Sequence, residues 1–346
     1  MVSIAIGIFF PIKDKKHNTS FNYFLGDRNM KTIPVALSFV VTYQSSIMML
    51  GIPAEVYTYG LEYAIGVIGV VVSYLLIILI IVPLFHPLNV TSVYEYYQLR
   101  YGTKSVRYLG VILGVIYYTL YMGIVLFGTA LAIESTTGLP VWMSTVSFAA
   151  AAALYTSLGG IKAVIWTDVF QSIIMLSGIL AVLLEGVSVF AYHSLRGCDP
   201  LASGQVTNPN QIIPFTILEM FHNFQGMSGL FIAALSSASL STISSGLSGL
   251  AAVTCIDLLK VLKPNITDQA ATNISKLFVV MYGIISTSFV LLITSVKGPL
   301  GELMFVFSGA VAGPETVMFL VSVFFRRSQP MLFCSHTFIG VGLSDG

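Results

Sequence analysis

The densest group of polar side chains lies at residues 236–249, where eight serine and threonine hydroxyls occur within fourteen residues. Hard cations such as sodium bind oxygen ligands from hydroxyls, carbonyls and carboxylates. On a helix, Ser241 and Thr242 together with the carbonyl of Ala238 would present three such oxygens on one turn. The alternative is a packing face, because small residues allow helices to approach closely. The density of hydroxyls favours a cation site.

A second polar run, residues 41–48 (VTYQSSIM), interrupts an otherwise apolar stretch and is followed by Gly51 and Pro53. A helix that breaks here would expose backbone carbonyls, as discontinuous helices do at the ion and substrate sites of secondary transporters. Serine and threonine also form hydrogen bonds between membrane helices without any further role. On spacing alone, the two interpretations are equal.

Two carboxylates lie inside apolar stretches. Asp168 is near the start of 164–184, where it would either complement the positive end of a helix or bind or relay a cation near the cytoplasmic mouth. Glu315 follows Gly313 and Pro314, and we expect a helix break there with the carboxylate facing a cavity. Charged groups inside an apolar stretch that crosses a membrane must be paired or functional.

Catalytic chemistry has no candidate residues in this sequence. It contains no nucleophile motif, phosphate-binding loop or paired-carboxylate signature. We therefore predict that the protein is not an enzyme, that it needs no cofactor, and that it binds no metal besides sodium. The five histidines have no metal-ligand spacing: His17, His86, His193, His222 and His336.

The composition indicates a membrane protein. Hydrophobic residues make up 56% of the 346 residues and charged residues 9%, against about 25% charged residues in an ordinary soluble domain. So few charges cannot cover this much apolar surface in water, so we predict an all-α protein whose partner is the lipid bilayer. The net charge of +1 excludes a nucleic-acid partner. Cys198, Cys255 and Cys334 have no paired spacing that would indicate a zinc site or a disulfide framework.

Apolar stretches of roughly 20 residues are long enough to cross the bilayer as helices. Two shorter stretches, 2–12 and 331–343, are predicted to be partial spans at the two ends. We expect eight full spans, at 34–54, 64–85, 109–133, 139–158, 164–184, 226–256, 277–296 and 303–325.

Lysine and arginine indicate the orientation, because cytoplasmic loops accumulate them. If the loop before residue 34 is cytoplasmic and the spans alternate, 14 of the 16 basic residues lie inside. Arg196 and Lys297 are the two that fall outside. The segment 193–214 is then an external loop, and it is rich in proline, glycine and serine.

One segment carries a specific family resemblance. Residues 155–171 (YTSLGGIKAVIWTDVFQ) resemble the sodium/solute symporter family, and the resemblance extends over residues 1 to 326. Further segments resemble its anion-carrying branch, which holds the sodium-coupled monocarboxylate, multivitamin and iodide transporters. These segments are 24–30, 51–60, 91–102, 198–201 and 240–254.

The resemblance implies a LeuT-like helix bundle of two inverted five-helix repeats, with sodium and substrate near the membrane centre. Carried over residue by residue, the sodium ligands fall on Val41, Gln44, Ala238, Ser241 and Thr242. The substrate-lining positions fall on Gln44, Met48, Phe127 and Phe305. Asp168 is predicted to act in coupling or as a cytoplasmic gate.

The chain also departs from the family pattern. We treat residues 1–346 as a single membrane domain with a complete first repeat at 34–186. Two family helices are then missing between Gly186 and Val187, because the sequence passes directly into what resembles the next outer loop. The remaining divisions are an outer loop and join at 187–225, the rest of the second repeat at 226–326, and a truncated tail at 327–346.

These features predict sodium-coupled symport of a small organic anion across the plasma membrane. The anion would be a monocarboxylate, a vitamin of the biotin or pantothenate type, or iodide. The alternative is a shortened, non-transporting form that binds or regulates full-length family members.

The charge distribution predicts a testable topology. A cysteine introduced at Ser203, in a background without the native cysteines, should react with an impermeant thiol reagent on intact cells. A cysteine at Ser105 should react only after the cells are permeabilised, because its loop is cytoplasmic. The reverse labelling pattern would exclude this orientation.

Overall fold

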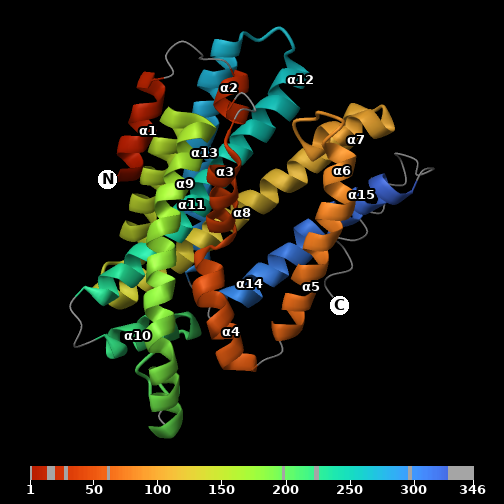
Figure 1. Ribbon diagram of the computed structural model, residues 1–346. Helices are drawn as coiled ribbons and strands as arrows, with labels where there is room; N and C mark the ends of the chain where they lie inside the picture. The colour runs from red at the N-terminus through yellow and green to blue at the C-terminus, as the bar shows by residue number, and fades with distance from the viewer. Residues whose placement is uncertain are drawn as a thin grey trace.

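The computed structural model describes residues 2–13, 20–26, 30–60, 63–196, 199–221, 226–294 and 298–325, and these residues are almost entirely helical. The helices are α1 (Val2–Lys13), α2 (Ser20–Leu25), α3 (Thr32–Tyr43), α4 (Ile52–Tyr59), α5 (Tyr63–Leu76), α6 (Val82–Phe85), α7 (Val93–Tyr101), α8 (Lys104–Thr137), α9 (Val141–Arg196), α10 (Ile212–Met220), α11 (Met227–Val253), α12 (Lys260–Leu262), α13 (Asp268–Ile293), α14 (Leu300–Phe307) and α15 (Gly313–Phe324). Figure 1 shows α1, α3, α9, α11 and α13 packed together, with α5 and α6 standing to one side.

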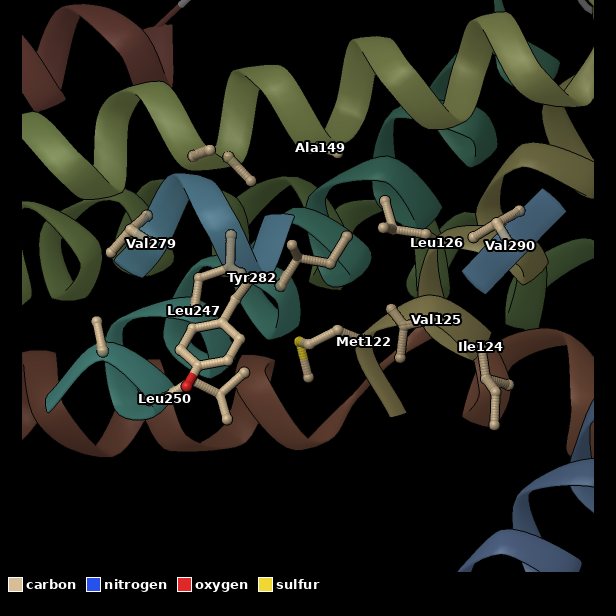
Figure 2. Close-up of a cluster of buried hydrophobic side chains, with 14 of the residues drawn as sticks. Met122, Ile124, Val125, Leu126, Ala149, Leu247, Leu250, Val279, Tyr282 and Val290 are labelled. Carbon is tan, nitrogen blue, oxygen red and sulfur yellow. The ribbon is translucent and has the colours of Figure 1, made fainter. Parts of the chain in front are cut away.

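The hydrophobic core lies where α8, α9, α11 and α13 meet. Figure 2 shows its buried side chains, among them Leu126 of α8 and Leu247 of α11. Glycines bring these helices close together: a Cβ on Gly246 would lie 2.3 Å from the sulfur of Met122. Because lipid is as apolar as leucine, such close van der Waals packing rather than hydrophobicity holds membrane helices together.

The first core helix is broken, as its polar run predicts. α3 ends at Tyr43, and a wide π-helical segment, Ile47–Gly51, leads into α4 after a bend of 48°. Gln44 has φ −86° and ψ 78°, outside the helical region. The break lies at Gln44 and Ser45, whereas Gly51 continues the helix. The polar residues themselves therefore mark the interruption.

α9 consists of two arms joined by a sharp turn at Gly160, which has φ 59° and ψ −164°. Tyr155 of the first arm donates to the carbonyl of Leu240, while Asp168 of the second arm accepts from Ser245. A straight helix would separate residues 155 and 168 by about 20 Å, whereas their partners are five residues apart on α11. The chain therefore reverses its direction, and the predicted spans 139–158 and 164–184 lie on separate arms.

Six helical segments among the described residues are long and apolar enough to cross a membrane, or seven if the bent pair α3 and α4 counts as one span. One of the six, Val141–Leu180, contains the Gly160 turn. All eight predicted stretches lie largely in helices, although the number of crossings stays a prediction. The stretch 2–12 forms α1, where a Cβ on Gly7 would clash with Tyr155 of α9. The stretch 331–343 and the tail lie outside the described residues.

One long helical segment has little protein around it. No residue is buried in the most apolar part of Ile65–Phe85, which contains α5 from Ile65 onward, the π-helical segment Ile77–Ile81 and α6. The side chains of Ile65 and Leu79 are among its most exposed. This face is open to lipid or to a partner.

The Gly160 turn predicts a stability effect. Gly160→Ala should lower the free energy of unfolding by about 2–4 kcal/mol, because positive φ disfavours a side chain and a Cβ would lie 2.8 Å from Tyr23. Thermal unfolding in detergent would measure this. Gly69→Ala is the control, since nothing lies within 4 Å of its Cβ position. Equal thermal midpoints for the two variants would contradict the role given to Gly160.

Candidate functional site

The break after α3 lies directly against α11. The hydroxyl of Thr242 donates to the carbonyl of Thr42 at 2.8 Å and to the carbonyl of Ala238 at 3.1 Å. Val41 and Ala238 are both fully buried and belong to one small apolar cluster with Met175 of α9. Two segments about 200 residues apart therefore place carbonyl and hydroxyl oxygens side by side.

Further hydroxyls extend this group along both helices. The Thr42 hydroxyl lies 3.4 Å from that of Ser241 and 3.2 Å from that of Ser245. Ser241 is completely buried and Thr242 nearly so. The structure thus brings Val41, Ala238, Ser241 and Thr242 together.

Asp168 completes the cluster from the second arm of α9. Its Oδ2 accepts hydrogen bonds from Ser38 of α3 and, at 3.4 Å, from Ser245 of α11. Ser241 also lies beside this carboxylate. Its Oδ1 is buried and has no hydrogen-bond partner among the described residues. These bonds run to neighbouring helices rather than to the start of its own helix, so they tie the carboxylate to the hydroxyl cluster.

The predicted substrate residues do not form one group. Gln44 lies half-buried at the helix break, and Met48, one turn further on, is 46% exposed. Phe127 is buried in the main hydrophobic core on α8. Phe305 on α14 is 55% exposed. Gln44 and Met48 flank the break, whereas Phe127 and Phe305 sit on other elements and in different surroundings.

Two residues of the cluster were not among the predicted ligands: Ser38, and Ser245, which lies within the predicted hydroxyl run 236–249. Helical periodicity contains the missing signal, because Ser38 precedes Thr42 by four residues and Ser245 follows Ser241 by four. Each pair therefore shares a helix face. The sequence has no comparable signal that Asp168 joins this cluster. Its position there depends on the reversal of α9 at Gly160.

The bundle is apolar, and inside it a broken helix carries a buried group of hydroxyls, carbonyls and one carboxylate. These are the features of a multi-pass membrane protein with a candidate cation site. The model of the sodium:solute symporter family matches residues 23–196, half of the chain. The chain belongs to this family. Its relatives are transporters and not enzymes, and sodium is their coupling ion, as the sequence predicts.

Similar proteins have been characterised in vertebrates. Sodium-coupled monocarboxylate transporter 2 of Mus musculus is 29% identical over 414 residues, which cover 94% of this chain and 67% of that protein. The Homo sapiens sodium/iodide cotransporter is 27% identical, covering 94% and 64%. The chain therefore spans about two thirds of the length of these relatives.

The alignment also bears on the prediction that two family helices are missing after Gly186. Its 414 positions exceed the 346 residues of this chain, so it crosses at least 68 positions that the relative has and this chain lacks. Two membrane helices of about 20 residues with their loops would fit into that length.

A solved structure shows the same fold. A sodium-coupled sialic acid symporter in a substrate-bound outward-open state superposes with a TM-score of 0.75 at 21% identity, covering 95% of this chain and 85% of that one. The all-α membrane bundle predicted from the sequence is therefore confirmed.

Proposed function

We propose that the protein takes part in sodium-coupled symport of a small organic anion, and that sodium binds where the break after α3 meets α11. The observation that carries this proposal is the pair of contacts between Thr42 and α11, from Ser241 and Thr242. The ligands would be the hydroxyls of Ser241 and Thr242 and the carbonyls of Val41, Gln44 and Ala238.

The chemistry of the cluster favours a cation. Hydroxyls and carbonyls offer oxygen ligands of the kind that hard cations take. The carboxylate of Asp168 supplies negative charge in a region where an unpaired charge is costly. Its unpartnered Oδ1 is an acceptor that a passing cation would satisfy. We therefore assign Asp168 to relaying sodium between the ligand cluster and the cytoplasmic mouth.

Sodium and substrate would be coupled through the conformations of the bundle. If sodium bridges α3 and α11 in the outward-open state, its binding free energy stabilises that state and raises substrate affinity there. Loss of the bridge then accompanies rocking of the bundle and inward release. Gln44 and Met48, which flank the break, would contact the substrate, with Phe127 and Phe305 contributing from α8 and α14.

The substrate class rests on the relatives. Their names specify monocarboxylates and iodide, and a monocarboxylate, a biotin- or pantothenate-like vitamin or iodide are the anions we propose for this chain. Its site of action would be the plasma membrane. Uptake of radiolabelled lactate, pantothenate and iodide into proteoliposomes would distinguish these three.

The sodium site predicts a specific pattern of substitution effects. Ser241→Ala and Thr242→Ala should each weaken sodium binding by about 1.5–3 kcal/mol, roughly one to two decades in affinity, because each removes one oxygen ligand. The sodium concentration that half-maximally raises the thermal midpoint would report this without requiring transport. Ser248→Ala is the matched control, since Ser248 is a buried serine further along the same helix. Equal effects at all three positions would favour the packing interpretation.

The length of the chain favours a second candidate function. The relatives carry at least 68 aligned positions that this chain lacks, and no residue is buried in the most apolar part of Ile65–Phe85. A chain that lacks the two family helices would bind full-length family members through the exposed face of Ile65–Phe85. It would regulate these transporters instead of transporting a solute itself.

These two functions predict different behaviour of the isolated chain. Because polar groups of the cluster would face lipid where helices are missing, we expect low stability and little or no sodium-driven uptake by the chain alone. Insertion of the two family helices between Gly186 and Val187 should restore uptake in proteoliposomes. Strong sodium-dependent uptake by the unmodified chain would refute the shortened-form interpretation.

A further inference from the structure

A second series of hydrogen bonds joins the break after α3 to α11, and it runs through α8. Ser46, which follows the break, is completely buried, and its hydroxyl donates to the carbonyl of Val125 on α8 at 2.8 Å. Four residues further along α8, the hydroxyl of Thr129 donates to that of Ser239 on α11 at 2.5 Å. These four residues form the α8 connection. The chain before the break contacts α11 directly through Thr42, so the two sides of the break are anchored by different routes.

The protons available to the α8 connection fix the direction of its hydrogen bonds. Inside a helix the Val125 carbonyl accepts from the backbone N–H four residues later, and Ser46 uses its second lone pair. The Thr129 hydroxyl lies 2.9 Å from this carbonyl but has a single proton, which goes to Ser239. The Ser239 hydroxyl in turn donates to the carbonyl of Leu235 at 3.0 Å. Each of the three hydroxyls therefore donates once, and each has an acceptor.

The backbone of α8 allows this close approach. A Cβ on Gly128 would lie 3.0 Å from the hydroxyl oxygen of Ser46 and 2.7 Å from Leu300. Thr129 and Ser239 are at most 1% exposed. The break therefore lies directly against α8, and the hydrogen bond between α8 and α11 is shielded from water.

Both ends of the α8 connection lie next to proposed sodium ligands. Ser46 is two residues beyond Gln44, whose carbonyl is one of these ligands. Ser239 shares a peptide group with Ala238, whose carbonyl is another. A shift of Ser239 therefore changes the position of the Ala238 carbonyl relative to the break.

We propose that Thr129 is a positioning residue of the sodium site, which holds the ligands of α11 at the distance from the break that sodium requires. This inference rests on the proposed sodium site. Ser46 ties the break to α8, Thr129 ties α8 to α11, and sodium closes the ring between Gln44 and Ala238. Without the Thr129 hydroxyl the site is less preorganised, so part of the binding free energy of sodium is used to restore the ligand spacing.

The alternative is a hydrogen bond that only packs α8 against α11, as serine and threonine often do between membrane helices. A packing bond would contribute to stability in the absence of sodium and would leave the affinity for sodium unchanged. A positioning residue changes the affinity itself. Sodium affinity therefore distinguishes the two roles.

The thermal midpoint of the purified chain in lipid nanodiscs, with choline replacing sodium at constant ionic strength, measures this affinity. Thr129→Val keeps the shape of the side chain and removes the hydroxyl. It should raise the sodium concentration that gives half of the maximal stabilisation about three- to tenfold. Thr129→Ser keeps the hydroxyl and should restore the value of the unmodified chain. Thr119→Val is the matched control, because Thr119 is also buried on α8 and donates to the carbonyl of Val115, and it should leave this concentration unchanged.

A double variant tests whether Ser46 and Thr129 act through one connection. Ser46→Ala alone should raise the half-maximal sodium concentration by a similar factor. Combined with Thr129→Val it should add little, because either substitution already interrupts the α8 connection. Factors that multiply in the double variant would show two independent contacts and would contradict the connection.

The outcomes separate this inference from the proposed function. An unchanged half-maximal sodium concentration in Thr129→Val, whatever its midpoint in choline, would overturn the inference and leave the sodium site in place. An unmodified chain that sodium does not stabilise would overturn the sodium site, and the inference with it. If Thr129→Val fails to fold, Ser239→Ala removes the α11 end of the same connection and must raise the half-maximal sodium concentration.

Discussion

In a bilayer, polar groups have no water to bond with, so each hydroxyl and carbonyl inside the bundle must find a partner within the protein. α11 carries six buried serine and threonine residues, and its hydrogen-bond partners fix its position. Thr242 donates to the carbonyl of Thr42 on α3, and Ser239 shares a 2.5 Å hydrogen bond with Thr129 on α8. On the third side, Tyr155 of α9 donates to the α11 backbone. The candidate sodium site is the part of this network that has more acceptor oxygens than hydrogen-bond donors.

The bilayer also makes backbone geometry decisive for helix packing, because close packing rather than hydrophobicity brings the helices together. Gly160 lets α9 reverse, and the reversal is what delivers Asp168 to α3 and α11. Gly114 lets α8 approach so closely that Tyr94 and Glu315 fit against its backbone. The hydroxyl cluster around Asp168 therefore depends on the positive φ of Gly160. The contact between Tyr94 and Glu315 depends on the absence of a side chain at Gly114.

A buried ion pair joins the start of α8 to the segment that follows α11. Arg107 of α8 lies 2.6 Å from Asp257, which follows α11. Ser92 caps α7 by accepting from the backbone of Glu95, and it also donates to Asp257. Because breaking a buried pair leaves an uncompensated charge, such a network holds its members in one arrangement. It thereby places α7, with Tyr94 and Tyr97, against α8.

The sequence by itself determined the class of the protein, because composition and the length of apolar stretches depend on the solvent and not on the arrangement of the helices. It also indicated Ser241 and Thr242, since helical spacing puts their oxygens with the Ala238 carbonyl on one turn. The sequence left open whether Asp168 caps a helix or faces a cation, and it gave Glu315 no partner. Only the tertiary structure gave the two carboxylates their hydrogen-bond partners, because these lie on helices more than 70 residues away along the chain, and contacts across such separations leave no periodic signal in the sequence.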